Sequence, residues 1–218
     1  MSPTLVQPAP APTRTPARRG ASIAAPTRPT PLRLRVGEPA PVQQSGRTCG
    51  SASATVARLL RDGGLREALL GVRATDGALA AYEERVHRRT NGVRGPSERP
   101  QVPWPRALGT PPWGLAAELA HVTGRPYRTQ WVRYRSPAAL WRLYVDLGAV
   151  LAPDLPAAIY VGSRRLPRHI GLVVPEAGRL ATYDPGWGRV APLEFGALAG
   201  HRLDVGGWPV PWCLVIPN

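Results

Sequence analysis

The stretch Gln43-Gln44-Ser45-Gly46-Arg47-Thr48-Cys49-Gly50-Ser51 decides the fold prediction, because it places a cysteine immediately before the first helical pattern of the chain. A thiol in the first turn of a helix lies near the positive end of the helix dipole and near unpaired backbone N–H groups. Both favour the thiolate, which is the nucleophilic form of cysteine. Six residues before Cys49, the side-chain amide of Gln43 is placed to donate a hydrogen bond to an oxyanion that forms beside the sulfur. We therefore predict that Cys49 is a nucleophile and Gln43 an oxyanion donor.

Two residues far downstream complete a catalytic set. His169 opens the apolar, strand-like run 169–174, and Asp184 follows the next such run, 15 residues later. Antiparallel strands joined by a short hairpin bring residues at these positions close together. Asp184 would accept a hydrogen bond from one ring nitrogen of His169 and fix its tautomer, while the other nitrogen takes the proton of Cys49.

The surrounding pattern predicts helices first and strands second. Helices are expected at residues 48–62, 76–90, 113–122 and 136–147. Gly63-Gly64 is expected to end the first of them. Strands are expected at residues 157–161, 169–174, 179–183, 189–191 and 211–216, a Pro- and Gly-rich loop at 91–112, and the start of an edge strand at 32–36. This order predicts an α+β fold in which an N-terminal helical half packs on a C-terminal antiparallel sheet.

Length and composition predict one folded domain preceded by a tail. The chain has 218 residues, of which 43% are hydrophobic, enough for one sizeable core. Residues 1–36 are rich in Pro, Ala and Arg and contain no acidic residue. Such a segment buries too little apolar surface to offset its chain entropy, which predicts a disordered basic tail before a domain at 37–218.

The charge of the chain does not indicate nucleic-acid binding. The net charge is +14, and all 28 basic residues are arginines spread along the whole length. A nucleic-acid site concentrates its basic residues on one face, so no nucleic-acid partner is expected. No apolar run reaches the length of a signal peptide or a membrane span, and the chain has only two cysteines. A cytoplasmic location without a membrane span is therefore expected, with Cys213 as an inert thiol in a buried strand.

The remaining titratable residues do not indicate a metal or cofactor. No CxxC or His-x3-His pair is present, and neither glycine-rich nucleotide-binding motif occurs. The charged residues of the helix expected at 76–90, Glu83 and His87 among them, are interpreted as a solvated face. No cofactor is therefore expected.

The ordered set resembles the C39-like group of papain-fold cysteine peptidases. The resemblance rests on the spacing from Gln43 to Cys49-Gly50, on the run that begins at His169, and on Tyr183-Asp184-Pro185, and it spans roughly residues 41–218. It implies a papain-like fold, a Cys-His-Asp triad with a Gln oxyanion donor, and a peptide or protein substrate. Two features depart from it: Thr48 stands where an acidic residue often precedes the cysteine, and a long Arg- and Pro-rich insertion separates Cys49 from His169. Relatives attached to transporters cleave double-glycine leader peptides, a role that does not carry over because this chain has no transporter segment.

Three functions are compatible with this set of candidate site residues. The first is a cysteine peptidase or amide hydrolase that works through a thioester on Cys49. The second is a transglutaminase-like acyltransferase, which passes the acyl group to an amine instead of water. The third is a catalytically inactive papain-like module that binds a peptide, in which Cys49 would be unreactive.

Overall fold

The computed structural model describes residues 31–72 and 74–218. The predicted tail, 1–36, lies outside these residues except for its last six, among which Leu34 is buried in the core. The edge strand expected at 32–36 is wrong. The chain turns at Gly37, whose φ is +83°, and only then contacts the edge of the sheet, where Gly37 N donates to Val190 O over 3.2 Å.

Four predicted helices are confirmed, and the described part of the chain contains two further helices. The helices are α1 (Cys49–Arg61), α2 (Gly63–Leu70), α3 (Ala78–Asn91), α4 (Pro112–Thr123), α5 (Pro137–Val150) and α6 (Phe195–Ala199). The loop expected at 91–112 contains the short 3-10 turns η1 (Pro96–Glu98) and η2 (Arg106–Leu108). The first helix ends at Arg61, just before Gly63-Gly64 as expected, but a new helix begins there, which Asp62 Oδ1 caps by accepting from Leu65 N over 2.9 Å.

Six antiparallel strands form one open sheet. The strands are β1 (Tyr127–Trp131), β2 (Ala157–Gly162), β3 (Pro167–Glu176), β4 (Arg179–Asp184), β5 (Arg189–Pro192) and β6 (Val210–Pro217). Their order across the sheet is β1-β6-β2-β3-β4-β5. The five predicted strands are confirmed. The sequence of β1, Tyr-Arg-Thr-Gln-Trp, lacks an apolar run because β1 is an edge strand without a buried residue.

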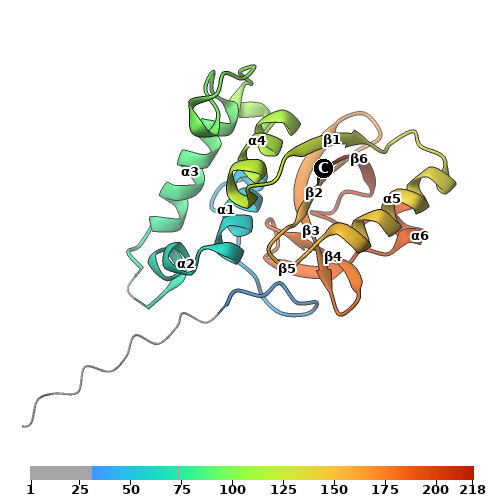
Figure 1. The fold of residues 1–218 in the computed structure, drawn as a ribbon, viewed down its shortest axis with the longest axis horizontal. Coiled ribbons are helices and arrows are strands. Elements are labelled where there is room, and N and C mark those ends of the chain that lie inside the picture. The colour runs from blue at the N-terminus through green and yellow to red at the C-terminus, as the bar shows by residue number, and fades with distance from the viewer. Residues whose placement is uncertain (1–30, 73) are drawn as a thin grey trace, which may run out of the picture.

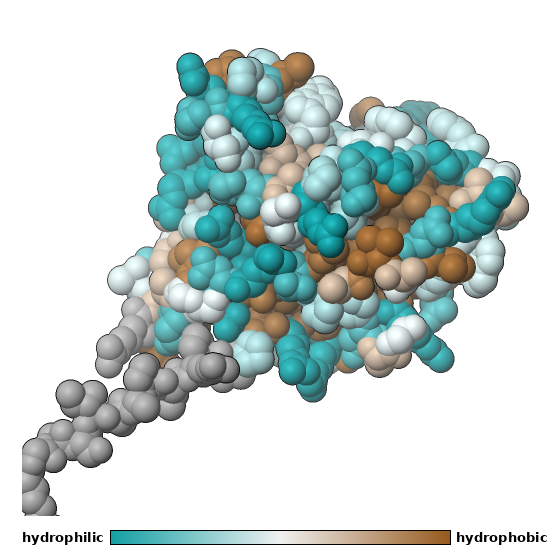
Figure 2. Space-filling model, viewed as in Figure 1, coloured by the Kyte–Doolittle hydropathy of each residue, from teal (hydrophilic) through white to brown (hydrophobic). Residues whose placement is uncertain are grey.

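Helices cover both faces of the sheet, which extends the predicted α+β arrangement by one layer (Figure 1). Alternate residues of the four inner strands, β6, β2, β3 and β4, enter two separate cores. On β2, Ala158 and Tyr160 pack with α1, α3 and α4, whereas Ile159 and Val161 pack with α5 and α6. Figure 2 shows apolar side chains gathered on the outer surface over this second layer. Among the residues of α5, Trp141 is half exposed.

The first core fixes α1 against β3. Most of α1 is buried, and Ser53 Oγ donates to Ile170 O over 3.4 Å, one residue beyond His169. The start of α1 is thereby placed at the start of β3.

None of the described helices is long and apolar enough to cross a membrane.

Candidate active site

Cys49 is the first residue of α1 and only 8% exposed. The helix start is packed tightly, because a Cβ added at Gly50 would lie 2.5 Å from Thr110 Cβ and 2.8 Å from Ile170 Cδ1. Only glycine allows the loop before α4 and the strand β3 to approach the helix this closely. The sulfur is therefore held at a helix N-terminus, beside backbone N–H groups that lack intrahelical partners.

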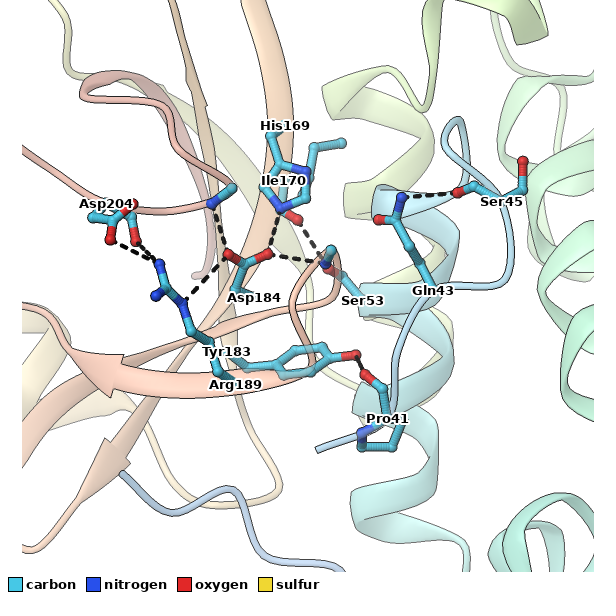
Figure 3. Close-up of polar contacts among 12 residues, drawn as sticks. Pro41, Gln43, Ser45, Ser53, His169, Ile170, Tyr183, Asp184, Arg189 and Asp204 are labelled. Atoms are coloured by element: carbon cyan, nitrogen blue, oxygen red, sulfur yellow. Dashed lines mark hydrogen bonds and ion pairs between the residues drawn. The ribbon is translucent and has the colours of Figure 1, made fainter. Parts of the chain in front are cut away.

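His169 and Asp184 form a buried pair at the ends of β3 and β4 (Figure 3). His169 Nε2 lies 2.7 Å from Asp184 Oδ1, which also accepts from Gly186 N over 2.9 Å. The second oxygen, Oδ2, accepts from Gly206 N over 2.7 Å. Because Nε2 is engaged by the carboxylate, Nδ1 is the ring nitrogen left for the thiol of Cys49.

The electrostatics of the pair favour charged partners at neutral pH. Burial disfavours the imidazolium, but the hydrogen bond to Asp184 and the interaction with the Cys49 sulfur outweigh burial and raise the pKa of His169 to about 9. Burial likewise opposes ionisation of Asp184, but the bonds from His169 and the Gly206 N–H outweigh it and lower the pKa of that carboxyl. An imidazolium beside a sulfur favours the thiolate.

Two glycines hold the imidazole in place. A Cβ at Gly206, whose φ is +61°, would lie 2.5 Å from His169 Cδ2, and one at Gly186 would lie 3.2 Å from His169 Cε1. Sequence reasoning did not identify either glycine as part of the site. The turn sequence Asp184-Pro185-Gly186 could have indicated Gly186. The only local feature that marks Gly206 is the neighbouring Gly207, which is typical of any turn.

Arg189 lies on the outer side of Asp184. Its Nε is 4.0 Å from Asp184 Oδ2, and its Nη2 donates to Asp204 Oδ2 over 2.8 Å (Figure 3). The guanidinium also lies 5.5 Å from the ring centre of Trp187, which is 65% exposed. Arg189 thus connects the triad carboxylate with the segment that contains Gly206 and with an exposed aromatic ring.

Gln43 lies in the turn that leads into α1, next to the β4–β5 connection. Its backbone N–H donates to Pro185 O over 2.8 Å, one residue after Asp184. Its side-chain Nε2 donates to Ser45 O over 2.8 Å, as Figure 3 shows. One of the two protons of the Gln43 amide is used in this way, and the other remains for a second acceptor.

The loop 91–112 reaches the start of α1. Asn91 Nδ2 donates to Gly109 O over 2.6 Å, and Trp104 and Trp113 pack edge to face, with ring centres 5.3 Å apart. These contacts bring Thr110 against Gly50. Trp104 of the loop is therefore held against Trp113 of α4.

The second cysteine and two residues of α3 are buried. Cys213 is 1% exposed in β6, as predicted, and burial raises the pKa of its thiol to about 12. The solvated face predicted for α3 is wrong for Glu83 and His87, which are 2% and 4% exposed. Both belong to a stripe at helical spacing, 83, 86, 87 and 90, that faces the protein interior. Burial lowers the pKa of His87, whose Nε2 lies 3.2 Å from Arg106 O.

The site combines a thiol at a helix start, a supported imidazole and nearby N–H donors. In the described part of the chain, no group of three or more His, Cys, Asp or Glu side chains is placed to hold a metal ion. A scan against models of known protein families gives no match, and neither does a search of curated proteins. Function is therefore inferred from the site itself.

Proposed function

We propose that this chain is a cysteine peptidase or amide hydrolase with a papain-like site. The observation that carries the proposal is the 2.7 Å contact between His169 Nε2 and Asp184 Oδ1, made where the same imidazole interacts with the sulfur of Cys49. These contacts support a nucleophile, a base and an orienting carboxylate for acyl transfer through a thioester.

In the first half of the reaction, the Cys49 thiolate attacks the carbonyl carbon of an amide. Nδ1 of the His169 imidazolium then gives its proton to the leaving amine as the C–N bond breaks and the S–C bond remains. In the second half, the neutral imidazole takes a proton from water and the hydroxide attacks the thioester; the S–C bond then breaks, the carboxylic acid leaves, and the thiolate and imidazolium are restored. Asp184 keeps Nε2 protonated in both halves, so Nδ1 carries out every proton transfer.

The oxyanion of each tetrahedral intermediate would be stabilised by two donors. One is the backbone N–H of Cys49, in the first turn of α1, and the other is the second amide proton of Gln43. Loss of one such donor typically lowers the rate about 10²- to 10³-fold. The proposed substrate is a peptide or protein, and the exposed ring of Trp187, three residues after Asp184, is placed to contact it.

The test is the pH dependence of alkylation by iodoacetamide, followed residue by residue by mass spectrometry, in the wild type and in His169→Ala. Rapid labelling of Cys49 that persists well below pH 7 in the wild type, and loses this low-pH limb in the variant, is expected for a thiolate–imidazolium pair. Cys213 is the internal control, because burial keeps it protonated. Labelling of Cys49 no faster than that of a free thiol, and indifferent to His169, would contradict the proposal and favour a binding module.

A further inference from the structure

Glu83 brings a buried carboxyl group from α3 to the turn before Cys49. The residue is 2% exposed, and its Oε2 accepts from Gln44 N over 3.0 Å and lies 3.3 Å from Thr48 Oγ1. Gln44 follows the proposed oxyanion donor and Thr48 precedes the nucleophile. A single oxygen atom is therefore bonded to both ends of the turn that connects these two residues.

Within residues 31–72 and 74–218, this carboxyl has no cationic partner. Among the described residues, none of the ion pairs includes Glu83, whereas the neighbouring Glu84 is exposed and pairs with Arg106 over 3.2 Å. Burial raises the pKa of Glu83, and the bonds from Gln44 N and Thr48 only partly offset this. An unpaired buried carboxyl is unfavourable unless its oxygens are bonded. The bonds that Glu83 makes all go to the turn before Cys49.

The turn itself is compact and is held from the opposite side by β4. Ser45 O accepts from the Thr48 N–H and from Gln43 Nε2, which closes the turn on itself. From the sheet, Tyr183 Oη donates to Pro41 O over 2.6 Å. Glu83 supplies the matching attachment on the helical side, so that the turn is fixed between α3 and β4.

We infer that Glu83 is a positioning residue that orients the Gln43–Cys49 turn, so that the Gln43 amide and the Cys49 N–H converge on one oxyanion. The inference rests on the proposed function. Its specific consequence is that loss of Glu83 impairs reactions that pass through a tetrahedral oxyanion more than reactions of the sulfur that do not. A purely structural role would affect both kinds of reaction in proportion to the folded fraction.

The experiment compares two reactions of Cys49 in the full chain. Alkylation by iodoacetamide is a displacement at carbon without an oxyanion, whereas acetylation by p-nitrophenyl acetate passes through one. In Glu83→Ala, the acetylation rate constant is expected to fall about 10- to 100-fold, and the alkylation rate constant less than about threefold. Glu83→Gln is expected to restore most of the acetylation, because one amide oxygen can accept both bonds. Glu84→Gln, which changes the exposed neighbour, is the matched control and is expected to behave as the wild type.

The outcomes separate this inference from the proposed function. A wild-type Cys49 no more reactive than a free thiol would contradict the proposed function and this inference with it. A reactive wild type whose two rate constants change equally in Glu83→Ala, or not at all, would overturn the positioning role alone. If Glu83→Ala does not fold, Glu83→Asp decides, because it keeps the carboxyl group and shortens the side chain that reaches Gln44 N and Thr48. A lower ratio of acetylation to alkylation in that variant supports the inference, and an unchanged ratio overturns it.

Discussion

The two cysteines have similar burial and very different surroundings. Cys49 is 8% exposed and Cys213 is 1% exposed, and both belong to the core between the helices α1, α3 and α4 and the sheet. Tyr160 lies close enough to each sulfur for both to raise the pKa of its hydroxyl, after the larger effect of burial. Burial and neighbourhood in the core therefore do not distinguish the two thiols.

The difference lies in what faces each sulfur. Cys213 stands in the middle of β6, where burial raises the pKa of its thiol. Cys49 stands at a helix N-terminus and interacts with an imidazole that Asp184 keeps protonated. Under the proposed function, the reactivity of Cys49 would therefore depend on residues more than a hundred positions away in the sequence.

The largest effect is expected when the sulfur of Cys49 is removed. Removal of the sulfur of Cys213 is the comparison. Cys49→Ala is expected to lower kcat/KM for acyl transfer on the order of 10⁴-fold, where the assay spans that range, because no other group can form the thioester. Cys213→Ala is expected to leave kcat/KM per folded molecule unchanged. Release of p-nitrophenolate from p-nitrophenyl acetate, corrected for spontaneous hydrolysis, measures both. Similar losses in the two variants would contradict the difference between the sites.

A smaller effect is expected when the imidazole is displaced and the sulfur is left intact. In Gly206→Ala the new Cβ would lie 2.5 Å from His169 Cδ2, so the ring must move away from Asp184. A displacement of about 1 Å at a catalytic group can cost about 100-fold in rate, and a loss of that size in the acetylation rate constant of Cys49 is expected.

Gly207→Ala is the matched control for this substitution. Gly207 also has a positive φ, +75°, but a Cβ there meets no atom within 4 Å. Both variants therefore introduce similar backbone strain, and only Gly206→Ala clashes with the imidazole. Equal loss of reactivity in the two variants would show that strain, and not the position of His169, is responsible.

The sequence predicted the contact between His169 and Asp184 because both residues belong to one hairpin. His169 is the third residue of β3 and Asp184 the last residue of β4, so the pairing of these strands brings them to the same end of the hairpin. The α+β fold and all five strands with apolar runs followed from the same patterns. The edge strand β1 was missed because an edge strand does not require such a run.

The groups that hold the site in place were not predicted, because they depend on contacts between distant elements. Glu83 was interpreted as part of a solvated face, since its neighbours on α3 are charged, yet the spacing 83, 86, 87 and 90 marks the buried side of that helix. Gly206 could not be distinguished from any other loop glycine, because its role depends on the imidazole that packs against it. Periodicity identifies a buried face, but it does not identify the atoms that a buried polar group meets.

The pH dependence of stability reports on the proton shared by Cys49 and His169. In Cys49→Ala the interactions with the sulfur are lost and only those with Asp184 oppose the effect of burial, so the pKa of His169 is expected to fall below about 9. The part of the shift above 6.5 that Asp184 retains contributes stability that is complete below about pH 6.5 and is lost as the pH rises through the folded-state pKa. A decrease in the free energy of unfolding, smaller than the roughly 3 kcal/mol that the whole shift corresponds to, is expected between about pH 6.5 and 8.5.

The wild type is expected to lack this decrease. If Cys49 has given its proton to His169, these two side chains together hold one proton in the folded protein between about pH 6.5 and 8.5. The unfolded chain also holds one there, on the thiol, so the free energy of unfolding is flat. Urea unfolding at a series of pH values measures both proteins. A wild type that loses stability as steeply as Cys49→Ala would show that Cys49 remains a neutral thiol like Cys213, whose own effect begins only above its ordinary pKa of 9.0.

The smallest effect is expected at Cys213 and concerns stability alone. Cys213→Ser places a hydroxyl among apolar side chains in β6, and burying a hydroxyl without a partner costs about 1–2 kcal/mol. The midpoint of urea unfolding is expected to fall accordingly, while the rate of alkylation of Cys49 in the folded protein stays the same. Cys213→Ala, which removes the sulfur without adding a polar group, separates loss of packing from burial of the hydroxyl. A slower alkylation of Cys49 in either variant would show that the two thiols are coupled through the core they share, most directly at Tyr160, whose hydroxyl lies near both sulfurs and donates to Thr110 O beside Gly50.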